Sequence, residues 1–278
     1  MTHQPTSPPA SASGPAAAMR RLPYRLHIPA RAVPGAAPLV AIHGISRNAG
    51  EHLRAYRALA ESSGRILIAP RFRSPAHPRY QQLGTEERPA DRALIGILDE
   101  VAAGLARPAR PVILIGFSGG AQFAHRFAMA HPERVAALGL GAAGWYTLPD
   151  AALPYPFGLG GGTSRAAEAR ENLDRFLSLP IHVHVGALDL ARDDVFRSDP
   201  HLDAAQGATR VERAARWARA VEGAARSRGL ASRVTFELLP GCAHDFTGCV
   251  KTGALPLRLG AWLDSLHLPH ETEPRSLR

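Results

Sequence analysis

The sequence predicts an α/β fold of three layers, in which a mostly parallel sheet carries helices on both faces. Short apolar runs alternate along the chain with segments whose apolar residues recur at helical spacing, which is typical of parallel sheets. One of these runs leads directly into a Gly-x-Ser-x-Gly turn. Hydrophobic residues make up 45% of the 278-residue chain, enough for a sizeable core.

In the first part of the chain, continuous apolar runs predict strands, and helical spacing predicts the helices between them. Leu94, Ile97, Leu98, Val101 and Leu105, for example, recur on one helical face. The expected elements are an edge strand at residues 22–28, a strand at 39–42, a helix at 51–62 ended by Gly64, a strand at 65–69, a polar loop at 71–88 and a helix at 91–106.

The second part continues the same alternation and closes on a helix with a proline near its first turn. The expected elements are a strand at residues 111–115, a helix at 121–128, strands at 134–140 and 181–185, a helix at 209–229, a strand at 234–239 and a helix at 257–266. Residues 145–162 are rich in Pro and Gly and are expected to be irregular.

No linker divides the chain, so we expect a single domain over residues 21–268, with a small cap insertion at 145–178. Residues 1–20, rich in Ala, Pro and Ser, and residues 269–278 are expected to be disordered tails, and Met19 is a possible start. The beginning of the chain does not have the pattern of a signal peptide, and no apolar run approaches the ~20 residues of a membrane span. These features favour the cytoplasm.

The net charge of +9 comes almost entirely from arginine, because Lys251 is the only lysine. A basic chain can bind nucleic acid or an anionic membrane. The arginines are scattered, however, and a coding bias that replaces lysine with arginine explains them better, so neither partner is expected. Cys242 and Cys249 are too few for a disulfide framework, and no Cys/His spacing indicates a metal site.

Residues 116–120, Gly-Phe-Ser-Gly-Gly, lie between a predicted strand and a predicted helix. This is the pattern of a nucleophile elbow, in which a tight turn exposes a serine at the carboxyl edge of the sheet. Because a serine hydroxyl is a weak nucleophile, it needs a neighbouring base and a group that orients the base. We therefore expect Ser118 to be a nucleophile.

In this architecture the acid and the base follow the serine in that order along the chain. Asp189 comes directly after the strand at 181–185 and is the expected acid, with Asp193 and Asp194 as competitors. His244 follows the last strand and is the expected base. The other histidines near these elements, for which we expect structural roles, are His125, His131, His182 and His184.

Two backbone N–H groups should stabilise the oxyanion that forms during acyl transfer. We assign one to Gly119, directly after the serine, and the other to Ile45 in the loop after residues 39–42. His43 is expected to fix that loop. The candidate pocket residues are His43, Ser46, Trp145 and Tyr146. Three further arginines could receive a carboxylate or phosphate or could simply be solvated: Arg71, Arg73 and Arg79.

Together, His43-Gly44, the 116–120 elbow, Asp189 and His244 resemble the α/β-hydrolase superfamily over residues 22–266. Within it, the chain is similar to bacterial esterases grouped near polyhydroxybutyrate depolymerases and feruloyl esterases. The resemblance implies hydrolysis of a small-molecule ester through an acyl-serine, without a metal or organic cofactor. The alternatives are an acyltransferase, a peptidase or a cofactor-free haloperoxidase on the same triad, or a non-catalytic interaction protein. The sequence does not indicate an oligomeric state.

Overall fold

A computed structural model describes residues 22–266, which form a seven-stranded sheet in the order β1-β3-β2-β4-β5-β6-β7. The strands are β1 (Tyr24–His27), β2 (Leu39–Ile42), β3 (Leu67–Pro70), β4 (Val112–Phe117), β5 (Val135–Gly141), β6 (Ile181–Gly186) and β7 (Val234–Leu239). Only β1 runs antiparallel to its neighbour. The predicted mostly parallel sheet is therefore confirmed.

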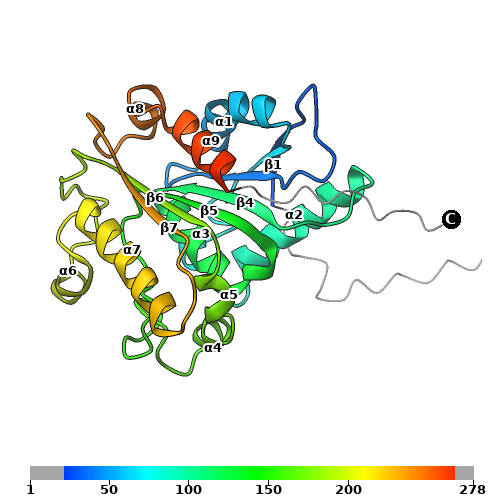
Figure 1. Cartoon of the computed structure of the whole chain (residues 1–278). Helices are drawn as coiled ribbons and strands as arrows, with labels where there is room; N and C mark the ends of the chain where they lie inside the picture. The colour runs from blue at the N-terminus through cyan, green and yellow to red at the C-terminus, as the bar shows by residue number, and fades with distance from the viewer. Residues whose placement is uncertain (1–21, 267–278) are drawn as a thin grey trace, which may run out of the picture.

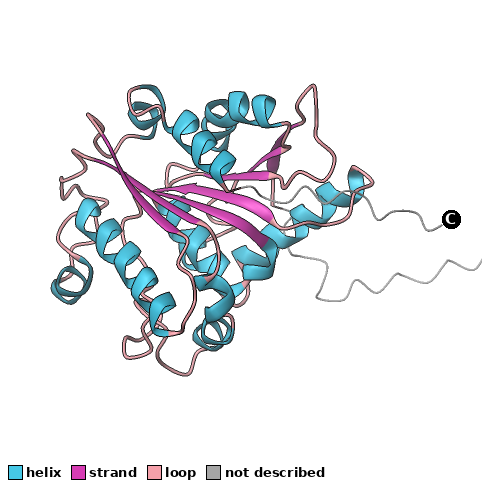
Figure 2. Ribbon diagram, in the orientation of Figure 1, coloured by secondary structure: helices cyan, strands magenta, loops and turns pink. Residues whose placement is uncertain are grey.

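Helices cover both faces of the sheet, which makes the three predicted layers (Figures 1 and 2). One face carries α1 (Ala49–Ser63), α8 (Phe246–Lys251) and α9 (Leu255–Ser265). The other carries α2 (Ala90–Gly104), α3 (Gly119–Ala130), α4 (Ser164–Glu171), α5 (Leu173–Leu177), α6 (Pro200–Gln206) and α7 (Arg210–Ser227). Every residue of α3 is buried, so the helix that follows the elbow forms part of the core.

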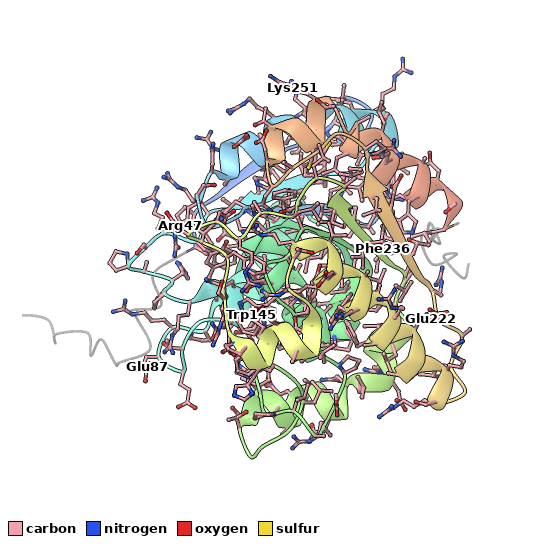
Figure 3. The ribbon with its side chains drawn as sticks, turned by 90° about the vertical axis from the view of Figure 1, so that its left-hand side faces the viewer. Arg47, Glu87, Trp145, Glu222, Phe236 and Lys251 are labelled. Atoms are coloured by element: carbon pink, nitrogen blue, oxygen red, sulfur yellow. The ribbon has the colours of Figure 1, made fainter. Side chains whose placement is uncertain are left out.

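The central strands β2, β3 and β4 are buried along their whole length, because helices cover both of their faces. The edge strand β7 differs, since its Phe236 and Leu238 are 40% and 44% exposed (Figure 3). The core and the elbow therefore share the centre of the sheet.

All seven strands lie where the sequence places them, apart from small differences in their ends. The predictions did not include the short helices α4, α5, α6 and α8 or the 3₁₀ turns Tyr80–Gln82 and Pro132–Arg134. One or two turns are too short to show a helical period, and such helices depend on capping, as when Asp199 accepts hydrogen bonds from His201 and Leu202 at the start of α6. Residues 145–162 are irregular, as expected.

The expected tails, residues 1–20 and 269–278, lie outside the described residues. The assignment of residues 21–268 to one domain, with a cap at 145–178, stays a prediction, as does the cytoplasmic location. Within residues 22–266, no helix combines the length and the apolar character needed to cross a membrane.

Candidate active site

Ser118 occupies the sharp turn between β4 and α3, with φ 54° and ψ −118°. A non-glycine residue rarely adopts a positive φ, so this strained conformation must be imposed by the surroundings. The Ser118 N–H donates to the carbonyl of Gly141 at 2.8 Å. A Cβ on Gly116 or Gly120 would collide with backbone atoms, since Gly116 approaches Gly120 and Gly120 approaches Ile42. The two outer glycines of the motif therefore make the tight turn possible.

His244 lies in the loop after β7, and its imidazole reaches the serine. Its Nε2 is 3.1 Å from Ser118 Oγ, within hydrogen-bonding distance. The imidazole stacks against the ring of Phe117 with a centroid separation of 5.5 Å. The next residue, Asp245, caps α8 by accepting from the N–H groups of Thr247 and Gly248. The cap and the ring contact together hold the His244 loop in place.

Asp189 lies behind His244, and its carboxylate is fully buried. The Nδ1–H of His244 donates to Asp189 Oδ2 at 2.7 Å. The loops that carry the two residues are also joined through their backbones, because the N–H of Ala187 donates to Leu239 O at 2.9 Å and that of Leu188 donates to Cys242 O at 2.8 Å. The distance between Asp189 and His244 is thus fixed by the ends of β6 and β7.

Arg210, on α7, contacts both Asp189 and its sequence competitor Asp193. Its Nη1 is 3.3 Å from Asp189 Oδ1, and its Nη2 donates to both carboxylate oxygens of Asp193, at 2.9 and 3.1 Å. These hydrogen bonds from Arg210 lower the pKa of Asp193. Asp194 is exposed. Of the three aspartates, only Asp189 is hydrogen-bonded to His244 among the described residues.

The two proposed oxyanion donors, Ile45 and Gly119, lie next to each other. A Cβ placed on Gly119 would be 3.3 Å from Ile45 N and 3.0 Å from the Tyr80 hydroxyl. Tyr80 donates to the carbonyl of His43 at 2.8 Å, which anchors the same loop. Within residues 22–266, neither the Ile45 N–H nor the Gly119 N–H has a hydrogen-bond acceptor, so both are available beside Ser118.

The candidate pocket residues differ in accessibility. Ser46 is exposed, Trp145 is 5% exposed, and His43 and Tyr146 are fully buried. The Nδ1–H of His43 donates to Gly44 O at 2.7 Å, and its Nε2 accepts from the N–H of Phe72 at 3.0 Å. Burial lowers the pKa of His43 to about 4, so the ring is neutral and holds the loop. His43 and Tyr146 support the site from beneath its surface.

The remaining histidines near these elements lie away from Ser118 in the fold. His125 Nδ1 donates to Ala121 O at 2.9 Å and its Nε2 accepts from the N–H of Thr147 at 2.9 Å, while His131 Nε2 is 2.9 Å from an Asp91 carboxylate oxygen. His182 and His184 are buried in β6. None of the four is hydrogen-bonded to Ser118 among the described residues.

Cys242 and Cys249, which flank the His244 loop, are free and buried. Burial raises the pKa of the Cys249 thiol to about 12, so Cys249 is protonated at neutral pH. This agrees with a packing role. No group of three or more His, Cys, Asp or Glu side chains within residues 22–266 is arranged to hold a metal ion.

Two residues of the site, Arg210 and Tyr80, were not assigned from the sequence. Arg210 lies on a helix that was predicted, but nothing in its local sequence indicates that its guanidinium reaches Asp189, 21 residues earlier. Tyr80 lies in the 71–88 segment, which was expected to be a polar loop, yet it is fully buried against His43 and next to Gly119. Contacts of this kind depend on the folded path of the loops.

Neither a protein-family model nor a curated protein matches the chain. Solved structures do. A poly(3-hydroxybutyrate) depolymerase from Bordetella parapertussis has 25% sequence identity and a TM-score of 0.71, with 88% of this chain and 86% of that chain covered. A poly(aspartic acid) hydrolase from Sphingomonas sp. KT-1 has 22% identity and a TM-score of 0.73, covering 86% and 92%. An S-formylglutathione hydrolase from Agrobacterium tumefaciens has 17% identity and a TM-score of 0.55, covering 86% and 88%.

These likenesses show the α/β-hydrolase fold, and the resemblance to serine esterases near the polyhydroxybutyrate depolymerases is confirmed. Because the neighbours are esterases and other hydrolases, they support ester hydrolysis in general.

Proposed function

We propose that this α/β-hydrolase cleaves carboxylic esters through an acyl-serine intermediate, with Ser118 as nucleophile, His244 as base and Asp189 as the acid that orients it. The observation that carries the proposal is one continuous hydrogen-bond chain. It joins Ser118 Oγ to His244 Nε2 at 3.1 Å and His244 Nδ1 to Asp189 Oδ2 at 2.7 Å. Serine hydrolases on unrelated folds use the same order of groups.

In the first half of the reaction, His244 Nε2 takes the hydroxyl proton while Ser118 Oγ attacks the ester carbonyl carbon. The carbonyl oxygen becomes an oxyanion, which the N–H groups of Ile45 and Gly119 stabilise. When the tetrahedral intermediate collapses, the bond from carbon to the alkoxy oxygen breaks. The His244 imidazolium then gives its proton to the leaving alcohol, and the acyl group stays on Ser118.

In the second half, water takes the place of the hydroxyl. His244 accepts a proton from the water as its oxygen attacks the acyl carbon, and a second oxyanion forms at Ile45 and Gly119. Collapse releases the carboxylic acid and returns the proton to Ser118. The overall reaction consumes one ester and one water and forms one acid and one alcohol.

Asp189 acts on the base without changing its own protonation. Its hydrogen bond keeps the proton on His244 Nδ1, so that Nε2 has a free lone pair toward Ser118. The same bond stabilises the imidazolium that forms in each half-reaction. Arg210 Nη1, 3.3 Å from Asp189 Oδ1, helps hold the buried carboxylate in place.

We propose a small-molecule ester as the substrate, approached from the carboxyl edge of the sheet. Ser46 and the side chain of Ile45, which is 47% exposed, lie on the accessible side of this edge. A hollow of about 820 Å³ exists elsewhere, at the amino ends of the strands. Pro38, Ile66 and Val112 line it, so it is distant from Ser118 along the strands and is not assigned to substrate.

The direct test measures turnover of 4-nitrophenyl esters of increasing acyl length, together with a hydroxybutyrate oligomer. The Ser118→Ala protein is the blank. We expect turnover by the wild type and loss of several orders of magnitude in the variant. Equal rates for the two proteins would contradict the assignment. Faster acyl release when an alcohol is added, with no hydrolysis in its absence, would indicate an acyltransferase.

A further inference from the structure

Many arginines of this basic protein are paired with carboxylates. Examples are Arg134 with Asp99, Arg165 with Asp91, Arg192 with Asp203, Arg210 with Asp193 and Arg258 with Glu237. Three arginines on or beside the loops of the candidate site differ. Arg47, Arg126 and Arg197 lie against aromatic rings. Arg47 and Arg126 donate hydrogen bonds mainly to carbonyl oxygens, and Arg197 has only a long contact of 3.9 Å with Asp199. Aromatic rings and carbonyl oxygens carry no full negative charge, so they do not neutralise Arg47 or Arg126, and the long contact with Asp199 neutralises Arg197 only weakly.

Arg47 lies on the oxyanion side of the site, two residues after Ile45. Its guanidinium is 5.1 Å from the centre of the Tyr80 ring, whose hydroxyl would be 3.0 Å from a Cβ on Gly119. It donates to the carbonyl of Phe72 and, at 3.5 Å, to that of His77. The side chain is half-buried and, among the described residues, no carboxylate lies within ion-pair distance of it. The charge of Arg47 therefore remains free to act on a ligand.

Arg126 and Arg197 lie against Trp145, which follows β5. Their guanidinium carbons are 4.1 and 5.1 Å from the centre of the Trp145 ring, and Arg197 is also 4.9 Å from that of Phe157. Arg126 is on α3, two turns after Ser118, and is 1% exposed. Its Nη2 is buried without a partner in residues 22–266. A buried cation without a counter-ion is costly, which points to an anion supplied from outside.

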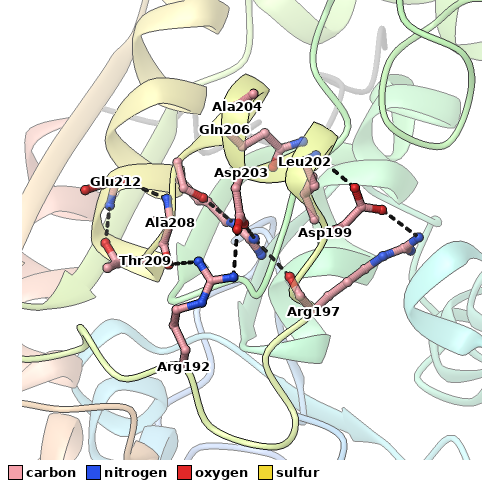
Figure 4. Close-up of polar contacts among 12 residues, drawn as sticks. Arg192, Arg197, Asp199, Leu202, Asp203, Ala204, Gln206, Ala208, Thr209 and Glu212 are labelled. Carbon is pink, nitrogen blue, oxygen red and sulfur yellow. Dashed lines mark hydrogen bonds and ion pairs between the residues drawn. The ribbon is translucent and has the colours of Figure 1, made fainter.

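Arg197 has a carboxylate nearby, but the pairing is weak. Its Nη2 is 3.9 Å from Asp199 Oδ2, whereas Arg192 Nη2 is 2.7 Å from Asp203 Oδ2 (Figure 4). Asp199 already uses its Oδ1 to cap α6. The Arg197 side chain is 42% exposed, so it can reach a ligand in solvent. Arg197 and Arg47 are thus the accessible members of the group, and Arg126 is the buried member.

We propose that the site accepts esters that carry a second, ionised carboxylate. Arg47 and Arg197 bind this carboxylate, and Arg126 adds to the positive electrostatic potential. The proposal rests on the function proposed above and specifies its substrate class. Guanidinium groups bind carboxylates through charge-assisted hydrogen bonds, and aromatic surroundings of low polarity strengthen the attraction. Unpaired cations around a site also raise the local concentration of anions.

The test compares two esters with six-carbon acyl chains, mono-4-nitrophenyl adipate, which is anionic, and 4-nitrophenyl hexanoate, which is neutral. We expect the wild type to favour the anionic ester in kcat/KM by about tenfold or more, mainly through a lower KM. The preference should shrink as salt rises, because exposed charges are screened. A wild type that favours the neutral ester, or has no preference, would overturn the proposal.

The variants Arg47→Met and Arg197→Met keep an apolar side chain of similar length and remove the charge. Each should lower the preference for the anionic ester several-fold, and Arg47→Lys and Arg197→Lys should retain most of it. Arg175→Met, an exposed position on α5, is the matched control and should leave the preference and the basal turnover unchanged. A full preference in both methionine variants would refute the assignment of Arg47 and Arg197.

A binding measurement separates this proposal from the proposed function. Adipate should raise the Tm of the Ser118→Ala protein, neutral adipamide should not, and Arg197→Met in the same background should reduce the increase. Arginine-dependent binding of adipate without any ester turnover would support the anion site and contradict ester hydrolysis. Ester turnover without a Tm increase from adipate would contradict the anion site alone.

Discussion

The protein contains two clusters with the same three kinds of side chain. In one, Asp189 contacts His244 and Arg210, and in the other Asp91 contacts His131 and Arg165. Both aspartates are fully buried, and both histidines lie within 2.9 Å of a carboxylate oxygen. By composition alone the two clusters cannot be told apart.

They differ in what the second nitrogen of each histidine faces. His244 uses Nδ1 for its aspartate and turns Nε2 to Ser118, whereas His131 uses Nε2 for Asp91 and packs its ring against Phe127. Burial would raise the pKa of Asp91, but hydrogen bonds from His131 and Arg165 outweigh it and hold that pKa well below its usual range. The Asp91 cluster ties α2, α3 and α4 together, and only the Asp189 cluster has a nucleophile.

The difference in role between the two clusters is tested most directly by replacing each histidine with glutamine. His244→Gln removes the base, so kcat should fall by about four orders of magnitude or more, with little change in Tm. His131→Gln should lower Tm through the lost partner of Asp91 and leave kcat of the folded enzyme within about twofold. Steady-state kinetics and thermal unfolding of both variants measure this. A large loss of kcat in His131→Gln would contradict the distinction.

Replacing the aspartates should likewise lower activity in the Asp189 cluster and stability in the Asp91 cluster. In Asp189→Asn the amide can force the wrong tautomer on His244, and kcat should fall by about 10³–10⁴-fold. In Asp91→Asn the Arg165 charge loses its buried counter-ion and keeps only Glu168, at 3.4 Å, which should cost about 3 kcal/mol of unfolding free energy. Urea unfolding and kcat, measured on both variants, show which aspartate supports activity and which supports stability. Equal kcat in Asp189→Asn and the wild type would refute the role of Asp189.

Sequence reasoning could find one cluster and not the other for a physical reason. The elbow is a local pattern, and parallel strands bring the loops with Asp189 and His244 to the same edge of the sheet, so order along the chain is enough to locate them. Asp91 lies on α2, Arg165 on α4 and His131 directly after α3, and they are up to 74 residues apart. No local sequence pattern predicts which helices pack against each other. Arg210 and Arg197 escape prediction for the same reason.

Acid unfolding extends the comparison to His43 and His52, two buried histidines that are not paired with a carboxylate among the described residues. Burial lowers the pKa of His43 to about 4 and that of His52 to about 3, against ~6.5 in the unfolded chain. The unfolded state therefore takes up protons first, and each residue should remove up to about 3 kcal/mol of stability as the pH falls from 6.5 to 4. Asp91, with its depressed pKa, should contribute a loss only below about pH 4.

Urea unfolding at pH 7, 6, 5 and 4 measures these contributions. His52→Gln should reduce the slope of unfolding free energy against pH between 6.5 and 4, and Asp91→Asn should leave that slope unchanged. An unchanged slope in His52→Gln would show that the ring is not kept neutral by burial.

The smallest effect is expected for Asp193, which shares Arg210 with Asp189 without contacting His244. Asp193→Asn weakens the support of Arg210 and should lower kcat by no more than about fivefold. The measurement is kcat beside that of Asp189→Asn. If the two variants lost activity equally, Asp193 would have to be reconsidered as the triad acid.

The backbone hydrogen bonds between the loops after β6 and β7 have a consequence for redesign. Since Ala187 and Leu188 bind Leu239 and Cys242 directly, the spacing of Asp189 and His244 does not depend on what stands at position 118. The two loops hold Asp189 and His244 at a fixed spacing, and the elbow places the nucleophilic atom beside them. A thiol or another oxygen nucleophile can therefore be introduced at position 118 to change the chemistry, while the Asp189–His244 pair that accepts the proton keeps its geometry.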